Sequence, residues 1–541
     1  MKKIIYSLLT CLLLTGVAKA QSQYQPYSYQ FYQKFNEDVY STKTRVHSSL
    51  KPFFIDDSLL RHKYDSLMNM GVDTTRHHSW IYRKLFNEHL IDVKTKEYTF
   101  FADYLTDAIV GNDLSNKKNT WLNTRGYQLG GTVGKNFYFY SRGFENQAVF
   151  PSYFNTYTNQ VGIVPGQAYD RSYGKKSYSD WSDVTAIASY TPVKYLNITL
   201  GHDKNFIGDG YRSQLLSDYA SSYPFLKLTA NVGNVKYMAM WSYMVDPVSP
   251  YTNYTNGYHN KWGVFHYLDW NVSNRLSVGF FDAVIWANVD SLGKYRGFEF
   301  SYANPVIFLR PVEASNGSPD NAMIGFTAKY KISDGITAYG QFVLDEFESK
   351  HFFKGDGSAR NKYSFQLGVR GANLFKIRSL NYLLEYNGAK PYTYSEKWNV
   401  INYSEQGEPL AHPFGANYEE LIGLLNYSYK RFDFSAELQY AHYGLDVNGL
   451  NYGKDIFMNY GYPAKLLGNY IGQGLTTNLY YGEVKVAYVV NPKLNSRIEV
   501  GALLRHERND AFLDRTTLFT IGLRSSFRNI YNDISAYRTH K

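Results

Sequence analysis

Cysteine is almost absent from this sequence. The 541 residues contain one, Cys11, which lies inside an N-terminal stretch with two early lysines, an apolar run over residues 4–16 and the triplet Ala18-Lys19-Ala20. That order of features is typical of a secretory signal peptide, so we expect residues 1–20 to be removed. The remaining chain would then have no thiol. This excludes disulfides, cysteine-ligated metals and cysteine nucleophiles.

Blocks of one charge sign are also absent. The formal charge is +10, and the three lysines of residues 1–20 bring it to 10 − 3 = +7 after cleavage. Basic and acidic residues alternate closely along the rest of the chain. We therefore expect weak, non-specific attraction to anions at most, and no nucleic-acid partner.

Long apolar runs are missing as well. No segment after the signal has eighteen consecutive apolar residues, which excludes a transmembrane helix. What the chain does contain is 53 tyrosines and 42 glycines, with aromatics at 18% and charged residues at 19%. An exported, Tyr- and Gly-rich chain without cysteine favours an outer-membrane β-barrel, in which aromatic residues line both lipid interfaces.

Strands of such a barrel alternate lipid-facing apolar residues with lumen-facing polar ones. Many windows show this alternation, including charged residues at the polar positions, where a dry sandwich core would not tolerate them. A soluble sandwich with one exposed face is the alternative. The windows lie near residues 124–133, 225–232, 363–370, 432–440, 497–505 and 519–524.

Short turns predict the strand number. Eight tight turns pair sixteen strands, and residues 97–110 and 513–528 add one strand at each end, giving about 18 antiparallel strands. Longer connections alternate with the turns, and we expect the longest to be extracellular and both termini to be periplasmic. We assign the strand-like residues 294–304 to a long loop, 289–320, folded into the lumen. The turns lie near Gly134, Pro192, Gly233, Ser273, Asp334, Asn373, Lys430 and Pro492.

The stretch before the barrel looks different. Helical patterns near residues 28–41, 57–70 and 78–92 predict a small periplasmic helical region, under or partly inside the barrel, with a disordered leader as the alternative. The expected organisation is a signal peptide at 1–20, this helical region at 21–96, an all-β transmembrane barrel at 97–528 and a C-terminal tail at 529–541.

One loop carries most of the candidate chemistry, the stretch LGHDKNFIGDGYRSQLLSD from Leu200. It lacks the GK[ST] of a phosphate-binding loop, and no HExxH or other metal-ligand spacing occurs in the chain. His202, Ser213 and Asp218 are the residue types of a hydrolase, but their spacing in the sequence does not show that they contact one another. We expect no catalytic residues, no metal and no cofactor. The remaining readings are charges that brace the loop against the wall, or polar groups that hold a sugar.

At this point the chain resembles the capsule-assembly Wzi-like outer-membrane family, nearest to its gliding-motility RemB-like branch. The resemblance implies an eighteen-stranded barrel with periplasmic helices that binds capsular polysaccharide and has no enzymatic activity. The RemB-like branch implies instead a role in surface motility. The resemblance rests on VHSSLKPF at Val46, TRGYQLGG at Thr124, FYSRGFENQAVFP at Phe139, the Leu200 stretch, YANPVIFLRPVE at Tyr302, SPDNAMIGF at Ser318 and VLDEF at Val343.

Three functions follow as expectations: organisation of surface polysaccharide, an accessory role in gliding motility or its secretion machinery, and a porin. Partners would be outer-membrane lipid, capsular or exopolysaccharide, and motility or secretion proteins. The mixed charges of the lumen predict little or no conductance. We expect residues 201–218 to fold into or over the lumen mouth, with Arg212 gripping a carboxylate, and to build a ligand site from Arg142, Glu145, His202, Asp203, Lys204, Asp209, Arg212, Asp218, Arg310 and Asp345.

Overall fold

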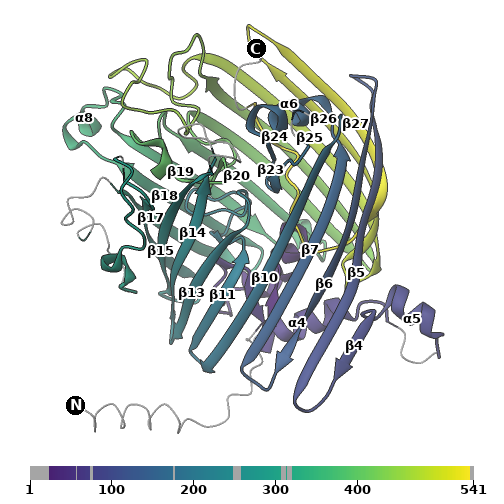
Figure 1. Cartoon of the computed structure of the whole chain (residues 1–541). Helices are drawn as coiled ribbons and strands as arrows, with labels where there is room; N and C mark the ends of the chain where they lie inside the picture. The colour runs from purple at the N-terminus through teal and green to yellow at the C-terminus, as the bar shows by residue number, and fades with distance from the viewer. Residues whose placement is uncertain are drawn as a thin grey trace, which may run out of the picture.

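The computed structural model describes residues 23–55, 58–72, 77–172, 174, 177–247, 257–290, 292–305, 312 and 320–536, so the expected signal peptide lies outside it. Eighteen antiparallel strands form one closed barrel, because the last strand pairs with the first (Figure 1). The predicted fold and strand number are confirmed. The strands are β5 (Tyr98–Asp113), β6 (Lys118–Val133), β7 (Phe137–Val149), β10 (Ser179–Val193), β11 (Leu196–Asp203), β13 (Tyr223–Val232), β14 (Val235–Asp246), β15 (His259–Asn271), β16 (Leu276–Ala287), β17 (Asn321–Ser333), β18 (Ile336–Glu346), β19 (Lys362–Gly371), β20 (Leu380–Ala389), β23 (Tyr418–Tyr429), β24 (Phe432–Leu445), β25 (Leu475–Asn491), β26 (Ser496–Arg508) and β27 (Leu513–Arg524).

The eight predicted turns each join two neighbouring strands at one end of the barrel, which we call the hairpin end. Gly134 and Gly233 have φ of 60° and 61° in two of these turns, a conformation that glycine adopts without strain. The long connections lie at the opposite end, which we call the loop end.

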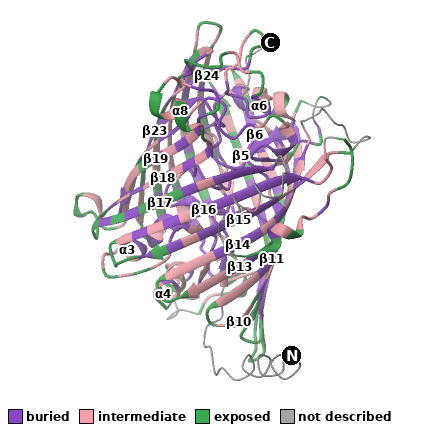
Figure 2. Cartoon of the chain, turned by 90° about the vertical axis from the view of Figure 1, so that its left-hand side faces the viewer, coloured by how far each residue is buried: buried purple, intermediate pink, exposed green. Residues whose placement is uncertain are grey.

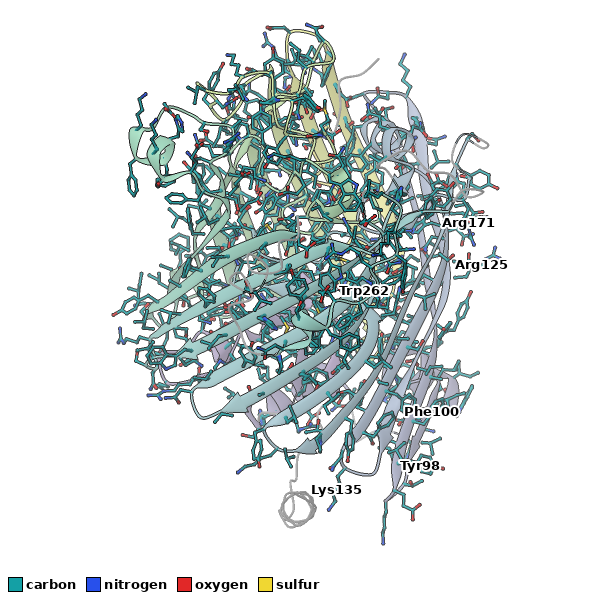
Figure 3. The ribbon with its side chains drawn as sticks, turned by 60° about the vertical axis from the view of Figure 1, so that its left-hand side comes forward. Tyr98, Phe100, Arg125, Lys135, Arg171 and Trp262 are labelled. Atoms are coloured by element: carbon teal, nitrogen blue, oxygen red, sulfur yellow. The ribbon has the colours of Figure 1, made fainter. Side chains whose placement is uncertain are left out.

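Alternation along most strands sends apolar side chains outward and polar ones into the lumen. Leu438 is 71% exposed while its neighbour Gln439 is 4% exposed, and Leu504 and Arg505 show the same contrast. In Figure 2, buried stretches alternate with intermediate or exposed ones along strands of the barrel wall. This inverted burial is what a wall facing hydrocarbon requires. Figure 3 shows Tyr98 and Phe100 near the hairpin end of the wall, with Arg125 and Arg171 nearer the loop end.

The N-terminal segment enters the lumen from the hairpin end. It consists of β1 (Gln23–Gln25), α2 (Tyr29–Tyr32), α3 (Asn36–Val39), β2 (Leu50–Lys51) and β3 (Phe53–Ile55), followed by α4 (Ser58–Met68). Its aromatic residues form a buried cluster with Phe206 and Phe527, which come from the rest of the chain. The segment therefore closes this end of the barrel.

Residues 77–94 lie differently from the prediction. The helix α5 (Trp80–Phe86) is followed by a strand, β4 (Ile91–Lys94), where we expected helix to continue to residue 92. β4 pairs with the start of β5, below the point where β27 ends, so both elements lie beside the barrel (Figure 1). The β-branched Ile91 and Val93 favour an extended strand over a helix.

The C-terminal tail lies differently from the expectation that both termini are at the periplasmic end. β27 ends at the hairpin end, as predicted, but residues 525–536 then rise through the lumen. The backbone N–H of Ala536 donates to Glu507 and Tyr443, at the loop end. The two described ends of the chain therefore lie at opposite ends of the barrel, not both at the hairpin end. The reason is electrostatic, because the acidic and basic groups of the tail find buried partners inside.

The loop after β16 is also placed differently. Its described part folds over the outer wall and not into the lumen: Trp241 Nε1 donates to the carbonyl of Tyr302 at 2.8 Å, and Tyr237 Oη donates to that of Pro305 at 2.6 Å. Trp286 and Tyr302 pack there with ring centroids 4.9 Å apart. Two other loops carry short helices, α6 (Ser152–Val161) and α8 (Ser349–Lys354). Within the described ranges, none of the helices has the length and apolar character needed to cross a membrane.

Candidate functional site

Several segments insert into the lumen, and four of them contain or contact the inward-facing candidate site residues. These four are the N-terminal segment, a plug loop between β11 and β13 (residues 204–222), a loop between β20 and β23 (residues 390–417), and the C-terminal tail. They share one large buried cluster with inward residues of the wall. The predicted inward folding of the stretch after Leu200 is thus seen in the structure, and the loop lies inside the barrel, not over its mouth.

Arg212 lies at the centre of this packing and is 1% exposed. Its guanidinium contacts Glu420 Oε1 at 3.1 Å and Asp533 Oδ2 at 2.5 Å, from β23 and the tail. Burial alone would lower the pKa of Arg212, but the two carboxylates raise it well above its ordinary value. The expected grip on a carboxylate is present, although neither partner was among the predicted residues.

Backbone groups of the plug loop are held as well. Glu385, an inward residue of β20, accepts hydrogen bonds from the N–H groups of Tyr211 and Arg212 at 3.0 and 3.1 Å. Gly210 lies so close to this carboxylate that an added Cβ would be 2.1 Å from its Oε2. The loop is therefore fixed by both charge and close backbone approach.

Asp209 ties the plug loop to the N-terminal segment. It accepts hydrogen bonds from Tyr40 at 2.9 Å and Ser49 at 2.7 Å, and pairs with Lys329 at 3.3 Å. Burial would raise its pKa, but the ammonium groups of Lys329 and Lys51 hold the pKa well below the ordinary value. The carboxylate is a structural anchor at the hairpin end of the lumen.

Three more predicted residues of this stretch also bind protein groups. Asp203 accepts a hydrogen bond from Tyr24, and Lys204 donates to the carbonyl of Gly166. Asp218 accepts hydrogen bonds at 2.6 Å from Asn529 and from Tyr531, both in the tail.

Arg142 and Asp345 reach the plug only through other residues. Arg142 donates to the carbonyl of Phe527 in the tail at 2.6 Å. Asp345 pairs with Lys362 at 3.3 Å and accepts from the N–H of Tyr394, whose hydroxyl donates to the carbonyl of Gln214. Both are lumen residues, as expected, but they join different parts of the packing.

Two predicted site residues do not face the lumen. Glu145 points outward from β7 and pairs with Arg171 at 2.6 Å, and His202 points outward from β11, with Nδ1 3.0 Å from the carbonyl oxygen of Val184. The physical reason is strand alternation, since each neighbours a residue that faces inward. Arg310 lies outside the described residues.

The lumen arrangement therefore suits structure better than ligand binding. Across the described ranges, no three His, Cys, Asp or Glu residues cluster as metal ligands would. A cavity of about 100 Å³ remains between the tail and the wall, and its charges are mixed: Glu437, Glu483 and Glu499 face Lys485 and Arg524. It has little room for anything larger than water and small ions.

A better candidate for binding opens at the loop end. A groove of about 150 Å³ lies beside α8, which projects from the loops at the upper left of Figure 1. Phe352 packs edge-on against Tyr363, with centroids 5.8 Å apart, and Lys390 Nζ lies 5.9 Å from the Tyr363 ring. The other lining residues are His351, Gly355, Gly357, Ser358, Asn361, Pro391 and Asn469.

The rim of this groove is ordered by local bonds. His351 Nδ1 lies 2.6 Å from Asp356 Oδ2, and the His351 ring lowers the pKa of that carboxyl. Asn469 Nδ2 donates to the carbonyl of Gly357 at 2.9 Å, which joins two loops that are distant in sequence. Burial lowers the pKa of Lys390. Aromatic rings beside fixed amide, hydroxyl and ammonium groups suit a polar ligand with apolar faces, such as a sugar.

Sequence reasoning missed this groove and the lumen partners. Glu385 and Glu420 could have been found as charged residues at inward positions of alternating strands. Asp533 and most groove residues gave no such signal, because they lie in the tail, in α8 and in loops that meet only in the folded barrel.

One solved structure of a known protein agrees with the fold of this chain. No protein-family model matches the sequence, and no curated protein sequence matches it. The solved structure of Wzi from Escherichia coli, described as an outer-membrane protein involved in group 1 capsule assembly and a carbohydrate-binding β-barrel, matches with a TM-score of 0.53 and 13% identity, over 92% of this chain and 98% of that one. OprD from Pseudomonas aeruginosa matches with a TM-score of 0.42 and 9% identity, over 78% of this chain and 94% of that one. OccAB2 from Acinetobacter baumannii gives 0.41 and 8%, over 79% and 97%. The chain thus has a Wzi-like barrel fold, while the nearer likeness to the RemB-like branch stays a prediction.

Proposed function

We propose that this protein is a non-enzymatic outer-membrane barrel that binds surface polysaccharide at its loop end. The observation that carries the proposal is the filled lumen beside a solvent-facing groove that has aromatic and polar walls. A filled lumen does not suit free passage of solutes, so the site of action is the surface. The carbohydrate binding stated for the Wzi barrel supports the same ligand class.

In this proposal the loop end faces the outside of the cell and the hairpin end faces the periplasm. The longest connections and α8 then meet the polysaccharide layer, while the N-terminal segment closes the barrel from the periplasmic side. This orientation follows the usual asymmetry of outer-membrane barrels.

Binding of native exopolysaccharide to the purified full chain tests the proposal. We expect Phe352→Ala and Lys390→Ala to weaken binding by about tenfold, because each removes a wall of the groove. Phe353→Ala is the matched control: Phe353 lies on the same helix, is 82% exposed and does not line the groove. Equal binding by all three variants would remove the groove from the proposal, and no binding by the unaltered chain would remove the function.

An accessory role in gliding motility or its secretion machinery is the second candidate. One observation favours it: α5 exposes Trp80, Ile81 and Leu85 at 59, 63 and 57% beside the hairpin end, a surface suited to a protein partner. A deletion strain scored for capsule retention and for spreading separates the two roles. Loss of capsule with normal spreading favours the first, and the reverse favours the second.

A further inference from the structure

The outer wall of the barrel has a hollow in its loop-end half. The hollow measures about 730 Å³ and lies over Gly423 of β23 and Gly482 of β25. A Cβ added at Gly423 would meet its nearest neighbour at 3.9 Å, and one at Gly482 at 3.4 Å, so the space above both glycines is free of protein. Leu384, Leu438 and Leu504 border it as members of the same cross-strand row.

The next row towards the loop end is aromatic. Tyr440 and Tyr480 have ring centroids 5.1 Å apart, and Tyr480 and His506 follow at 6.2 Å. His506 pairs in register with Arg515 on β27, and Arg515 also borders the hollow. The hollow is therefore apolar at its floor and has a basic corner.

The basic corner lies where the wall changes from apolar to polar. One row further out, the outward residues are Glu419, His442, Asn478 and Arg508. Towards the hairpin end of the same strands they are apolar, for example Val484, Val486 and Val500. The hollow thus lies just inside the apolar band; Arg515 borders it, and Arg508 lies one row nearer the loop end.

Both arginines are exposed, and within the described residues neither guanidinium is paired with a carboxylate. Unpaired guanidinium groups beside an apolar surface favour an anion with two oxygens to share, which phosphate provides. An anion free in solution would make no favourable contact with the apolar floor. A phospholipid carries an acyl chain for the floor and a phosphate for the arginines in one molecule.

We propose that this hollow is a binding site for a phosphate-bearing lipid of the adjoining leaflet, which we call the lipid site. One acyl chain lies over Gly423 and Gly482, and the phosphate binds Arg508 and Arg515. The hollow retains an acyl chain that would exchange quickly with bulk lipid on a flat wall. The two arginines select the headgroup. This site is independent of polysaccharide binding at the groove beside α8.

The test uses the full chain in phosphatidylcholine nanodiscs that contain either phosphatidic acid or diacylglycerol with the same acyl chains. Retained lipid is counted by native mass spectrometry after release into detergent. We expect phosphatidic acid to be retained about tenfold over diacylglycerol, from two charge-assisted contacts. Arg508→Gln with Arg515→Gln should abolish the preference, and Gly423→Leu with Gly482→Leu should abolish retention of both lipids. Arg125→Gln, an exposed outward arginine on β6, is the matched control and should change neither.

Several outcomes overturn the proposal. Equal retention of the two lipids by the unaltered chain, or an unchanged preference in the double-arginine variant, removes the headgroup site. A dimer of the purified chain that the double-leucine variant dissociates assigns the hollow to a second copy instead. If the leucine variant does not fold, as judged by heat-modifiable gel mobility, the arginine variant still decides, because both of its positions are exposed.

Discussion

Arg212 is the residue on which the filled lumen depends most. It joins the plug loop, the wall and the tail through Glu420 and Asp533, and all three side chains are buried. Such a triad holds its shape only while each charge keeps a partner, since an unpaired charge away from water is costly.

We expect Arg212→Ala to lower the free energy of unfolding by about 3–5 kcal/mol, because two buried carboxylates lose their cation. Denaturant unfolding in detergent micelles measures this. Arg171→Ala, at a half-exposed pair on the outer wall, is the control and should cost less than about 1 kcal/mol. A folded, stable Arg212→Ala chain that had lost polysaccharide binding would instead make Arg212 a ligand residue.

Glu408 predicts a pH dependence. It lies in the short hairpin of β21 (Ser404–Glu405) and β22 (Glu408–Pro409), accepts from the N–H of Gly166 at 2.7 Å, and burial raises its pKa from 4.5 to about 8. The folded chain keeps this proton where the unfolded chain has lost it. Stability from this group is therefore complete below pH 4.5 and falls as the pH rises towards 8.

Melting temperatures between pH 5 and 9 test this expectation. Glu408→Gln should flatten the decline, since an amide has no proton to lose, whereas Glu145→Gln on the outer wall should leave the profile as it is. An unchanged profile in the Glu408→Gln chain would show that the carboxyl is already ionised in the folded barrel.

At the scale of elements, the C-terminal tail is the segment whose position matters most for permeability. It fills the lumen beside β24–β27, with Arg528 paired to Asp107 at 2.7 Å and Asp533 paired to Arg212. The full chain should therefore show little or no conductance in planar bilayers.

Deletion of the residues after Arg524 should open the barrel. We expect stepwise currents in planar bilayers from the truncated chain, because the lumen charges of β24–β27 then face water. Asp533→Asn is the comparison, since it removes one ion pair but leaves the tail in place, and it should stay closed. A truncated chain that folds and does not conduct would show that the remaining lumen segments close the barrel without the tail.

At the scale of the whole molecule, wall and lumen segments form one packed unit. The N-terminal segment, the plug loop and the tail contact one another as well as the wall, as Tyr40 with Asp209 and Phe31 with Phe527 show. Shared contacts of this kind couple the segments, so they unfold together.

Calorimetry in detergent should then give one transition for the full chain. Removal of residues 23–55 should lower the melting temperature of the barrel itself, because the aromatic cluster at the hairpin end loses most of its members. A separate transition at lower temperature in the full chain, with the barrel unaffected by the deletion, would show instead that residues 23–55 unfold independently and are bound weakly to the barrel.

The barrel wall could be predicted from local features of the sequence. Period-2 alternation such as that around Leu438 and Gln439 depends only on which side chains tolerate hydrocarbon, and turns such as Gly134 depend on local backbone geometry. Both are local, so the strand number and the two ends of the barrel could be predicted, together with the inward folding of the loop after Leu200.

The contacts inside the lumen and at the rim depend on the folded barrel. Asp533 reaches Arg212 across more than 300 residues of sequence, and Asn469 reaches Gly357 across more than 100. Glu145 and His202 face outward, although the residue next to each in the sequence faces the lumen. A sequence motif does not show which of two adjacent residues points inward. Partner choice in the lumen is set by desolvation and by the closed geometry of the barrel, and neither exists until the strands have paired.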